Sequence, residues 1–242
     1  MIYIPDTHGR PFAIDTLLKR EKDEDVVMLG DYLEPYPDEG ISPEMAIEVF
    51  EEILDIKKEC PDKIHLLLGN HDFACIDESM ISCRHDYRNA NRITQLFHDN
   101  LDLFDIAYEH ELGDKTYVLS HAGFHRSWIE NVKMEFEDPF DNRDIVKKMN
   151  EYFHQDYKQL LPVLKMYSYY RGGGLFYGSC IWADVREYLS ASNVDGPIFD
   201  GCYQVFGHTQ LVDKPIITDR FACIDCRCGF RLNDKNQLIE KI

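Results

Sequence analysis

The sequence predicts an α/β protein whose central strands run parallel. Short apolar runs, continuous rather than alternating, recur along the 242-residue chain, and each ends at a glycine or a polar cluster. Runs of this kind are typical of strands that are buried on both faces. Helical patterns separate the first three runs, which lie at residues 2–4, 26–29 and 64–68. Because strands that alternate with helices favour a parallel sheet, the α/β class follows from these observations.

Two helices are predicted between these strands. The first covers residues 12–22, and the second begins at Ser42-Pro43. Serine is a preferred N-cap residue, and proline is favoured at the first helical position. Phe50, Ile53 and Leu54 then recur at helical spacing, with charged residues between them for the exposed face.

The second half of the chain is less regular. Further strands are predicted at 117–119, 203–206, 216–217, 221–225 and 238–242, with a turn around residues 233–234. Between Phe124 and Cys180 the rhythm stops, and one helix is expected from Asn142 towards Leu161, ended by Pro162. We expect a single domain over residues 1–242, with an irregular helical insertion at about 125–180.

Composition excludes several classes of protein. Lys+Arg 26 against Asp+Glu 44 gives a formal charge of −18, which argues against a nucleic-acid-binding or anionic-membrane-binding protein. No apolar run approaches the ~20 residues that span a bilayer. The first residues lack the features of a signal peptide, so the eight cysteines are expected to be reduced thiols and the location cytoplasmic.

Chemically active residues collect where the apolar runs end. In an open α/β sheet this edge is the usual ligand site. Carboxylates and imidazoles without cysteine suit Mn, Fe or Zn, and the set is large enough for two ions if one carboxylate bridges them. The spacing of Asp6 and His8 places both side chains on the same side of an extended backbone. The residues at these ends are Asp6, His8, Asp31, Asn70, His71, His121 and His208.

Five blocks in order resemble the calcineurin-like metallophosphoesterase family. They are Asp6-Thr7-His8-Gly9, Gly30-Asp31, Gly69-Asn70-His71-Asp72, His121-Ala122-Gly123 and Gly207-His208-Thr209. The resemblance covers nearly the whole chain. It implies two mixed β-sheets in a sandwich flanked by helices, and a metal-dependent phosphoesterase that uses two divalent ions, Mn first, with Fe or Zn as alternatives.

The resemblance also implies a role for each residue of the motifs. Asp6 and His8 would bind the first ion, Asp31 would bridge, and Asn70, His121 and His208 would bind the second. His71 would protonate the departing oxygen, with Glu34 as its carboxylate partner. An imidazole suits that task because a carboxylate can set its pKa near neutrality.

Several blocks resemble one branch of the family, the protein serine/threonine phosphatases and symmetrical diadenosine-tetraphosphatases. These blocks are Gly207-His208-Thr209, Gly30-Asp31-Tyr32, Trp182-Ala183-Asp184 and Cys223-Ile224-Asp225. A metal site at Cys223, Cys226 and Cys228 is disfavoured, because no second ligand pair stands nearby.

Two residues depart from the branch. Pro35 stands where the branch has a phosphate-binding arginine, and Asp72 replaces a glutamate. Proline cannot supply the planar fork of a guanidinium, so another arginine must bind the phosphate. Arg186 is the first candidate, because the branch has a phosphate-binding arginine near that tryptophan block. The other candidates are Arg171, Arg84 and Arg88.

The expected substrates are phosphorylated proteins of the phosphoserine and phosphothreonine kind, with diadenosine tetraphosphate or other nucleotides as the alternative. A weakly catalytic metal-binding regulatory protein is an alternative of another class, favoured only by the missing arginine at Pro35. A nuclease is a third possibility, which the negative charge disfavours.

Overall fold

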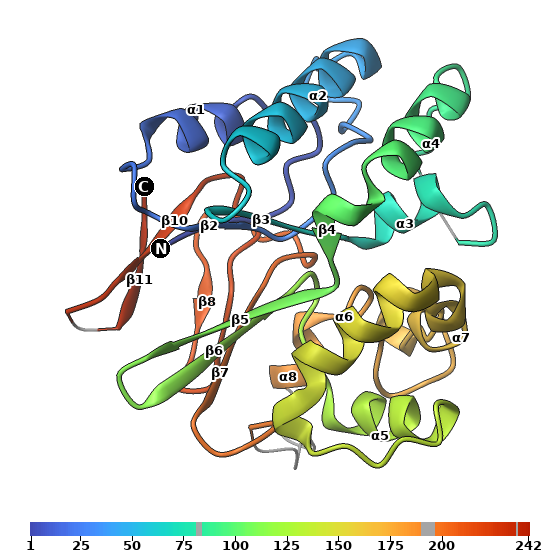
Figure 1. Cartoon of the computed structure of the whole chain (residues 1–242), viewed down its shortest axis with the longest axis vertical. Coiled ribbons are helices and arrows are strands. Elements are labelled where there is room, and N and C mark those ends of the chain that lie inside the picture. Colours follow the sequence, from blue (N-terminus) through green and yellow to red (C-terminus); the bar gives the residue numbers. More distant parts are fainter. Residues whose placement is uncertain (81–83, 190–196, 236) are drawn as a thin grey trace. The chain divides into compact units, whose positions relative to one another are not determined.

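The computed structural model describes residues 1–80, 84–189, 197–235 and 237–242. The chain forms two compact units. The first unit comprises Met1–Asp105 and Arg227–Ile242, and the second comprises Ile106–Cys226. Each unit contains one mixed sheet with helices beside it (Figure 1), so the predicted α/β class with two mixed sheets is confirmed. The expectation of a single domain stays a prediction.

The sheet of the first unit has the strand order β11-β10-β1-β2-β3-β4. The predicted parallel arrangement is confirmed for β1 to β4, while β10 and β11 add an antiparallel edge. Tyr3 lies beside Val27, and Val27 beside His65. The strands are β1 (Ile2–Ile4), β2 (Val26–Met28), β3 (Ile64–Leu67), β4 (Phe104–Asp105), β10 (Phe230–Asn233) and β11 (Leu238–Lys241).

The described residues of this unit form four α-helices. Both predicted helices are present as α1 (Phe12–Lys19), which ends three residues early, and α2 (Pro43–Glu59). The Met45 N–H donates to Ser42 Oγ at 3.1 Å, which confirms the predicted cap. Figure 1 shows α1 and α2 together over the sheet. Two further helices, α3 (Asn70–Ile76) and α4 (Ala90–Asp99), were not predicted from the sequence.

The second unit has its own five-stranded sheet in the order β5-β6-β7-β9-β8. Strands β6, β7 and β9 run parallel, and β5 and β8 are antiparallel to their neighbours. The strands are β5 (Ala107–Leu112), β6 (Lys115–Ser120), β7 (Cys202–Phe206), β8 (Ile216–Ile217) and β9 (Phe221–Cys223).

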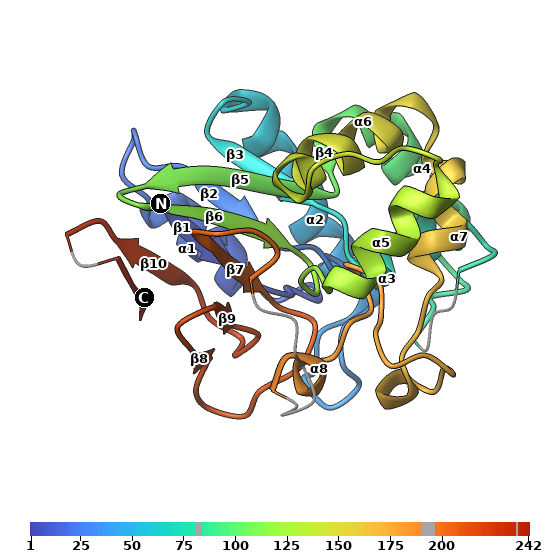
Figure 2. The ribbon, with the colours of Figure 1, turned by 90° about the horizontal axis from the view of Figure 1, so that it is seen from below.

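The irregular part of the second unit is helical (Figure 2). It contains α5 (Arg126–Glu135), α6 (Ile145–Asp156) and α7 (Leu161–Leu164), followed by α8 (Val185–Leu189). One detail of the prediction is wrong, because Pro162 does not end a helix but stands in the first turn of α7. At that position the missing N–H has no helical partner to lose, so proline is tolerated.

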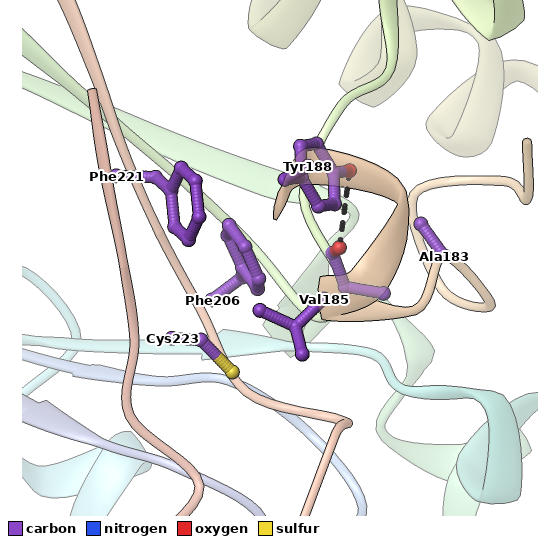
Figure 3. Close-up of a cluster of buried hydrophobic side chains, with 7 residues drawn as sticks. Ala183, Val185, Tyr188, Phe206, Phe221 and Cys223 are labelled. Carbon is purple, nitrogen blue, oxygen red and sulfur yellow. Dashed lines mark hydrogen bonds between the residues drawn. The ribbon is translucent and has the colours of Figure 1, made fainter. Parts of the chain in front are cut away.

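An apolar cluster supports the ends of β6 and β7 in the second unit (Figure 3). Phe206 and Phe221 stack with ring centroids 5.4 Å apart, and Tyr188 of α8 packs beside both rings. The Tyr188 hydroxyl donates to the Ala122 carbonyl oxygen at 3.2 Å. Ala122 follows His121, and Phe206 lies two residues before His208, so this packing fixes the backbone from which both histidines project.

In the part of the chain that the structure describes, no helix is both long enough and apolar enough to cross a membrane.

Candidate metal and phosphate site

The first three motifs meet at one edge of the first sheet. Asp6 and His8 follow β1, Asp31 follows β2, and Asn70 and His71 open α3 directly after β3. All five are buried, with exposures between 1% and 7%. Their clustering follows from the parallel strands, whose carboxyl ends lie side by side.

Close contact between two loops makes glycine necessary at Gly30. Its φ is +99°, and a Cβ there would lie 2.4 Å from the backbone nitrogen of Gly69. Side-chain carbons do not approach backbone atoms so closely, so any larger residue would push the two loops apart. The two glycines of the motifs therefore bring Asp31 next to the first turn of α3.

Asp72 fastens these same loops together. Its carboxylate accepts hydrogen bonds from the backbone N–H groups of Asp31 at 2.7 Å, Tyr32 at 3.0 Å and Gly69 at 2.8 Å. Burial, with the Asp31 charge nearby, raises the pKa of Asp72. Asp72 stands where the branch has a glutamate. Its shorter side chain still reaches the three backbone N–H groups and holds the two loops of the site together.

Four of the candidate residues adopt positive φ values, which are uncommon outside glycine. The values are +45° for His8, +55° for Asp31, +62° for Glu34 and +61° for His208. Such conformations cost of the order of 1–3 kcal/mol each and persist only where the surroundings impose them. Their concentration at these motifs is an independent sign of a functional site.

His8 is held as a neutral imidazole in a fixed orientation. Its Nδ1–H donates to the Leu33 carbonyl oxygen at 2.9 Å, so Nε2 carries the lone pair and lies 3.7 Å from Asp31 Oδ2. Burial lowers the pKa of His8 to about 3, because it opposes the charged form more than the Asp31 charge favours it. A neutral imidazole with its second nitrogen hydrogen-bonded to the backbone is the usual form of a metal-ligating histidine.

His71 is paired with Glu34, as the resemblance implied. Its Nδ1–H donates to the Glu34 carboxylate in a short hydrogen bond, and its backbone N–H donates to Asp31 Oδ1 at 3.0 Å. The imidazole is thus oriented from two directions, with Nε2 on the side away from Glu34. A second histidine, His85, reaches the other oxygen of the same carboxylate, with Nδ1 3.4 Å from Oε1.

Arg84 brings a positive charge to these groups. Its Nε donates to the Glu34 carbonyl oxygen at 3.0 Å, and its guanidinium carbon lies 3.9 Å from the centre of the Tyr36 ring. Nη2 lies 3.5 Å from His71 Nε2 and 3.2–3.3 Å from the two ring nitrogens of His8. Of the four candidate arginines, Arg84 therefore lies against the His71–Glu34 pair in the first unit.

The second unit supplies the remaining two histidines. His121 Nε2 and His208 Nδ1 are 3.1 Å apart, and the Gly207 N–H donates to the His121 carbonyl oxygen at 2.8 Å. The Cys223 thiol reaches the carbonyl oxygens of Gly207 and Thr209, so that cysteine holds the turn around His208.

The two arginines favoured by the sequence lie in the second unit and share Asp184. Arg186 donates to both oxygens of the Asp184 carboxylate, at 2.7 Å and 2.9 Å, and its guanidinium carbon lies 4.5 Å from the Tyr170 ring centre. Arg171 Nε lies 3.1 Å from Asp184, and Nη2 donates to Thr209 Oγ1 at 3.0 Å. Arg171 thus contacts the residue after His208, whereas Arg186 forms a local ion pair. A phosphate-binding role for either stays a prediction.

These donors fit divalent ions. Two of the candidate ligand atoms, His8 Nε2 and Asp31 Oδ2, lie 3.7 Å apart. Two nitrogens that each lie 2.0–2.1 Å from one tetrahedral ion are about 3.3 Å apart, which matches the 3.1 Å between His121 and His208. Whether the two units contribute to one dinuclear centre, as the ligand set of Asp6, His8, Asp31, Asn70, His121 and His208 requires, stays a prediction.

The family model for calcineurin-like phosphoesterases matches residues 2–210. The chain belongs to the calcineurin-like phosphoesterase family. As a member of this family, the protein is a metal-dependent hydrolase of phosphoric esters. A search of curated protein sequences finds no match.

One solved phosphatase structure has a fold similar to that of this chain. A cold-active protein tyrosine phosphatase superposes with a TM-score of 0.62 over 99% of this chain and 77% of its own, at 18% identity. A protein serine/threonine phosphatase from Saccharomyces cerevisiae is also similar, at 19% identity, with a TM-score of 0.38 over 52% of this chain and 38% of its own. At 18% identity, the tyrosine phosphatase structure supports the fold of this chain and says nothing of its substrate.

Three residues of this calcineurin-like site were not anticipated. Tyr36 packs edge-on against His8, with ring centroids 5.0 Å apart, and beneath Arg84. His85 and Cys75 lie beside Glu34. None of the three belongs to the five motifs. Cys75 lies in α3 and His85 in the loop after it, and the sequence pattern did not predict α3.

Proposed function

We propose that the protein hydrolyses phosphomonoesters with two divalent ions, held by Asp6, His8, Asp31, Asn70, His121 and His208. The observation that carries this proposal is the oriented His71–Glu34 pair beside the buried His8 and Asp31. A general acid next to metal ligands is what cleavage of an unactivated alkyl ester requires. We favour Mn, with Fe or Zn as alternatives, on the mixed oxygen and nitrogen donors.

The bound ions would supply Lewis-acid activation of water and of the phosphoryl group. The chain's own residues do the rest. Glu34 holds the imidazole of His71 through Nδ1, so that Nε2 presents a proton to the departing alcohol. Arg84 places its guanidinium next to that nitrogen, where it can bind phosphoryl oxygens and stabilise the charge that spreads over them.

Arg84 thereby replaces the arginine that is missing at Pro35. It reaches the site from the loop that follows α3, while the main chain of Glu34 and the face of Tyr36 fix its orientation. A guanidinium held in this way loses little freedom when it binds an anion. We therefore propose Arg84 in place of Arg186 as the phosphate-binding arginine. In the second unit, the guanidinium of Arg186 already donates to both oxygens of the Asp184 carboxylate.

For substrates, we propose phosphoserine and phosphothreonine proteins, with diadenosine tetraphosphate and other nucleotides as the alternative. A cavity of about 470 Å³ borders Glu34 and Arg84 in the first unit, and apolar side chains such as Ile47 and Ile93 line much of it. It could receive the leaving group. A panel of phosphopeptides, nucleotides and diadenosine tetraphosphate, each assayed with the Mn-loaded protein, would rank these classes.

The decisive test combines metal analysis with one assay. Asp31→Asn should lose bound metal and nearly all hydrolysis of p-nitrophenyl phosphate, because a shared ligand is removed. The thermal midpoint of the wild-type protein should fall on chelation and recover with Mn, whereas that of the variant should change little. Metal bound by the wild-type protein with no turnover across Mn, Fe, Co and Zn would favour the regulatory alternative instead.

We also infer a cytoplasmic location. The seven cysteines that the structure describes are free thiols, which suits a reducing compartment.

A further inference from the structure

We propose that Glu34, Cys75 and His85 form a separate binding site for a soft divalent cation, with Zn²⁺ as the fitting ion. All three residues belong to the first unit. Glu34 and Cys75 are each 3% exposed, and the His85 side chain is 22% exposed, so the site is enclosed but reachable from one side.

The separations of the ligand atoms match a zinc coordination sphere. Glu34 Oε1 lies 3.4 Å from His85 Nδ1 and 4.0 Å from Cys75 Sγ, and all three ligand atoms lie within 4.8 Å of one another. Tetrahedral bonds of 2.0–2.3 Å require ligand atoms about 3.3–3.8 Å apart. The side chains therefore need only small movements to close on one ion.

Chemistry distinguishes this cluster from the ligands proposed for the family's metals. A thiol and an imidazole favour Zn²⁺ over Mn²⁺, which prefers oxygen donors. Burial, followed by the charges of Glu34, Asp72 and Asp31, raises the pKa of the Cys75 thiol, so without metal it stays protonated. The same carboxylates attract a cation, and zinc binding would release the thiol proton to solvent.

Two cavities open onto the cluster. One, of about 470 Å³, is lined by Glu34 and His85, and the other, of about 860 Å³, by Cys75 and His85. They provide a path for the ion and room for a water as the fourth ligand, which three protein ligands leave open.

Zinc bound at this cluster would affect catalysis, an expectation that rests on the proposed function of His71 and Glu34. Glu34 orients His71 through its other carboxylate oxygen, so an ion that binds Oε1 draws this carboxylate away from the imidazole. We expect Zn²⁺ added to the Mn-loaded enzyme to lower kcat on alkyl phosphates while KM changes little.

Cadmium titration of the Mn-loaded protein tests the site itself. Cd²⁺ bound to a thiolate gives an ultraviolet charge-transfer band, and Cys75→Ser should remove one equivalent of it. His85→Asn should weaken that step at least about tenfold, since loss of an outer-shell partner alone costs ~10–100-fold in metal affinity. Cys60→Ser is the matched control, because Cys60 is half-buried in the same unit and lies at the C-terminus of α2, outside the cluster.

The outcomes separate the site from the proposed function. Bands that are equal in wild-type protein and Cys75→Ser would overturn the site. A Cys75-dependent band with zinc inhibition that Cys75→Ser and His85→Asn both relieve supports the site and its effect. A Cys75-dependent band without any zinc inhibition keeps the site but refutes the role of Glu34 in orienting His71.

Discussion

His71 and Glu34 show how single side chains specialise within this site. The short hydrogen bond from His71 Nδ1 to Glu34 fixes the tautomer and the plane of the imidazole. The hydrogen bond from the His71 backbone N–H to Asp31 Oδ1 fixes the position of the residue's main chain. His8, a few ångströms away, is kept neutral by burial. Two histidines whose rings lie edge to face at 5.2 Å thus have different surroundings, which suit the roles proposed for them, His8 as a ligand and His71 as an acid.

The role of His71 predicts a substrate-dependent defect. His71→Asn should keep its metal and lose about 10²–10⁴-fold in kcat on alkyl phosphates, because their alkoxide leaving groups need a proton. The loss on p-nitrophenyl phosphate should be much smaller, since nitrophenolate leaves unprotonated. Equal losses on the two substrates would refute the general-acid assignment.

The position of Arg84 predicts weaker anion binding in its absence. Arg84→Ala should raise KM and the inhibition constant of inorganic phosphate by about 10–100-fold, the effect of losing one or two charge-assisted hydrogen bonds. Arg92→Ala is the control and should leave both constants unchanged, because Arg92 is an exposed arginine of α4 in the same unit that pairs with Glu51. If Arg171→Ala or Arg186→Ala has the larger effect, the assignment to Arg84 is wrong.

Loops between elements, rather than the elements themselves, carry this chemistry. Strands β1 to β3 set the spacing of the motifs, while Gly30 and the Asp72 carboxylate join the loop after β2 to the start of α3. In the second unit, Asp184 joins the segment around Arg171 to the start of α8 and, through Arg171, to the turn after β7.

Asp184 makes this connection sensitive to acid. Burial alone would raise the pKa of Asp184, but hydrogen bonds from Arg186 and the charge of Arg171 lower it below its ordinary 3.8. A lowered pKa means that the stabilisation is complete above about pH 4 and is lost as the pH falls through the folded-state value. Asp184→Asn should reduce the free energy of unfolding by about 1–3 kcal/mol at pH 7.

Urea unfolding at several pH values checks this expectation. The difference between wild-type protein and Asp184→Asn should shrink below pH ~4, where the carboxylate protonates first in the unfolded chain and, at lower pH, in the folded protein. Asp219→Asn, at a carboxylate exposed to solvent, is the control. A difference that stays constant down to pH ~3 would contradict the ion-pair explanation.

At the scale of the whole molecule, net charge opposes the substrate. The two divalent ions of the proposed function would change −18 only to −18 + 4 = −14, so an anionic substrate would meet a repulsive protein. Under the proposed function, attraction would be local, from the ions and Arg84, and salt would screen the longer-range repulsion beyond a Debye length of ~8–10 Å.

Ionic strength should therefore help rather than harm substrate capture. Raising salt from ~0.05 to ~0.2 M should leave kcat/KM for a multiply charged phosphopeptide unchanged or increase it. A neutral-flanked phosphopeptide is the matched control and should respond less. A steep loss of kcat/KM with salt would show that a basic surface captures the substrate.

The sequence by itself determined the fold class, the parallel start and the family, because buried strands and the residues at their ends leave short contiguous patterns. It also paired His71 with Glu34, through the spacing of a known motif. Only the tertiary structure decided that Arg84 lies against that pair, and that Cys75 and His85 flank Glu34. Those positions depend on α3 and the loop after it, and contacts between residues some 40 to 50 positions apart follow from chain folding rather than from any local pattern.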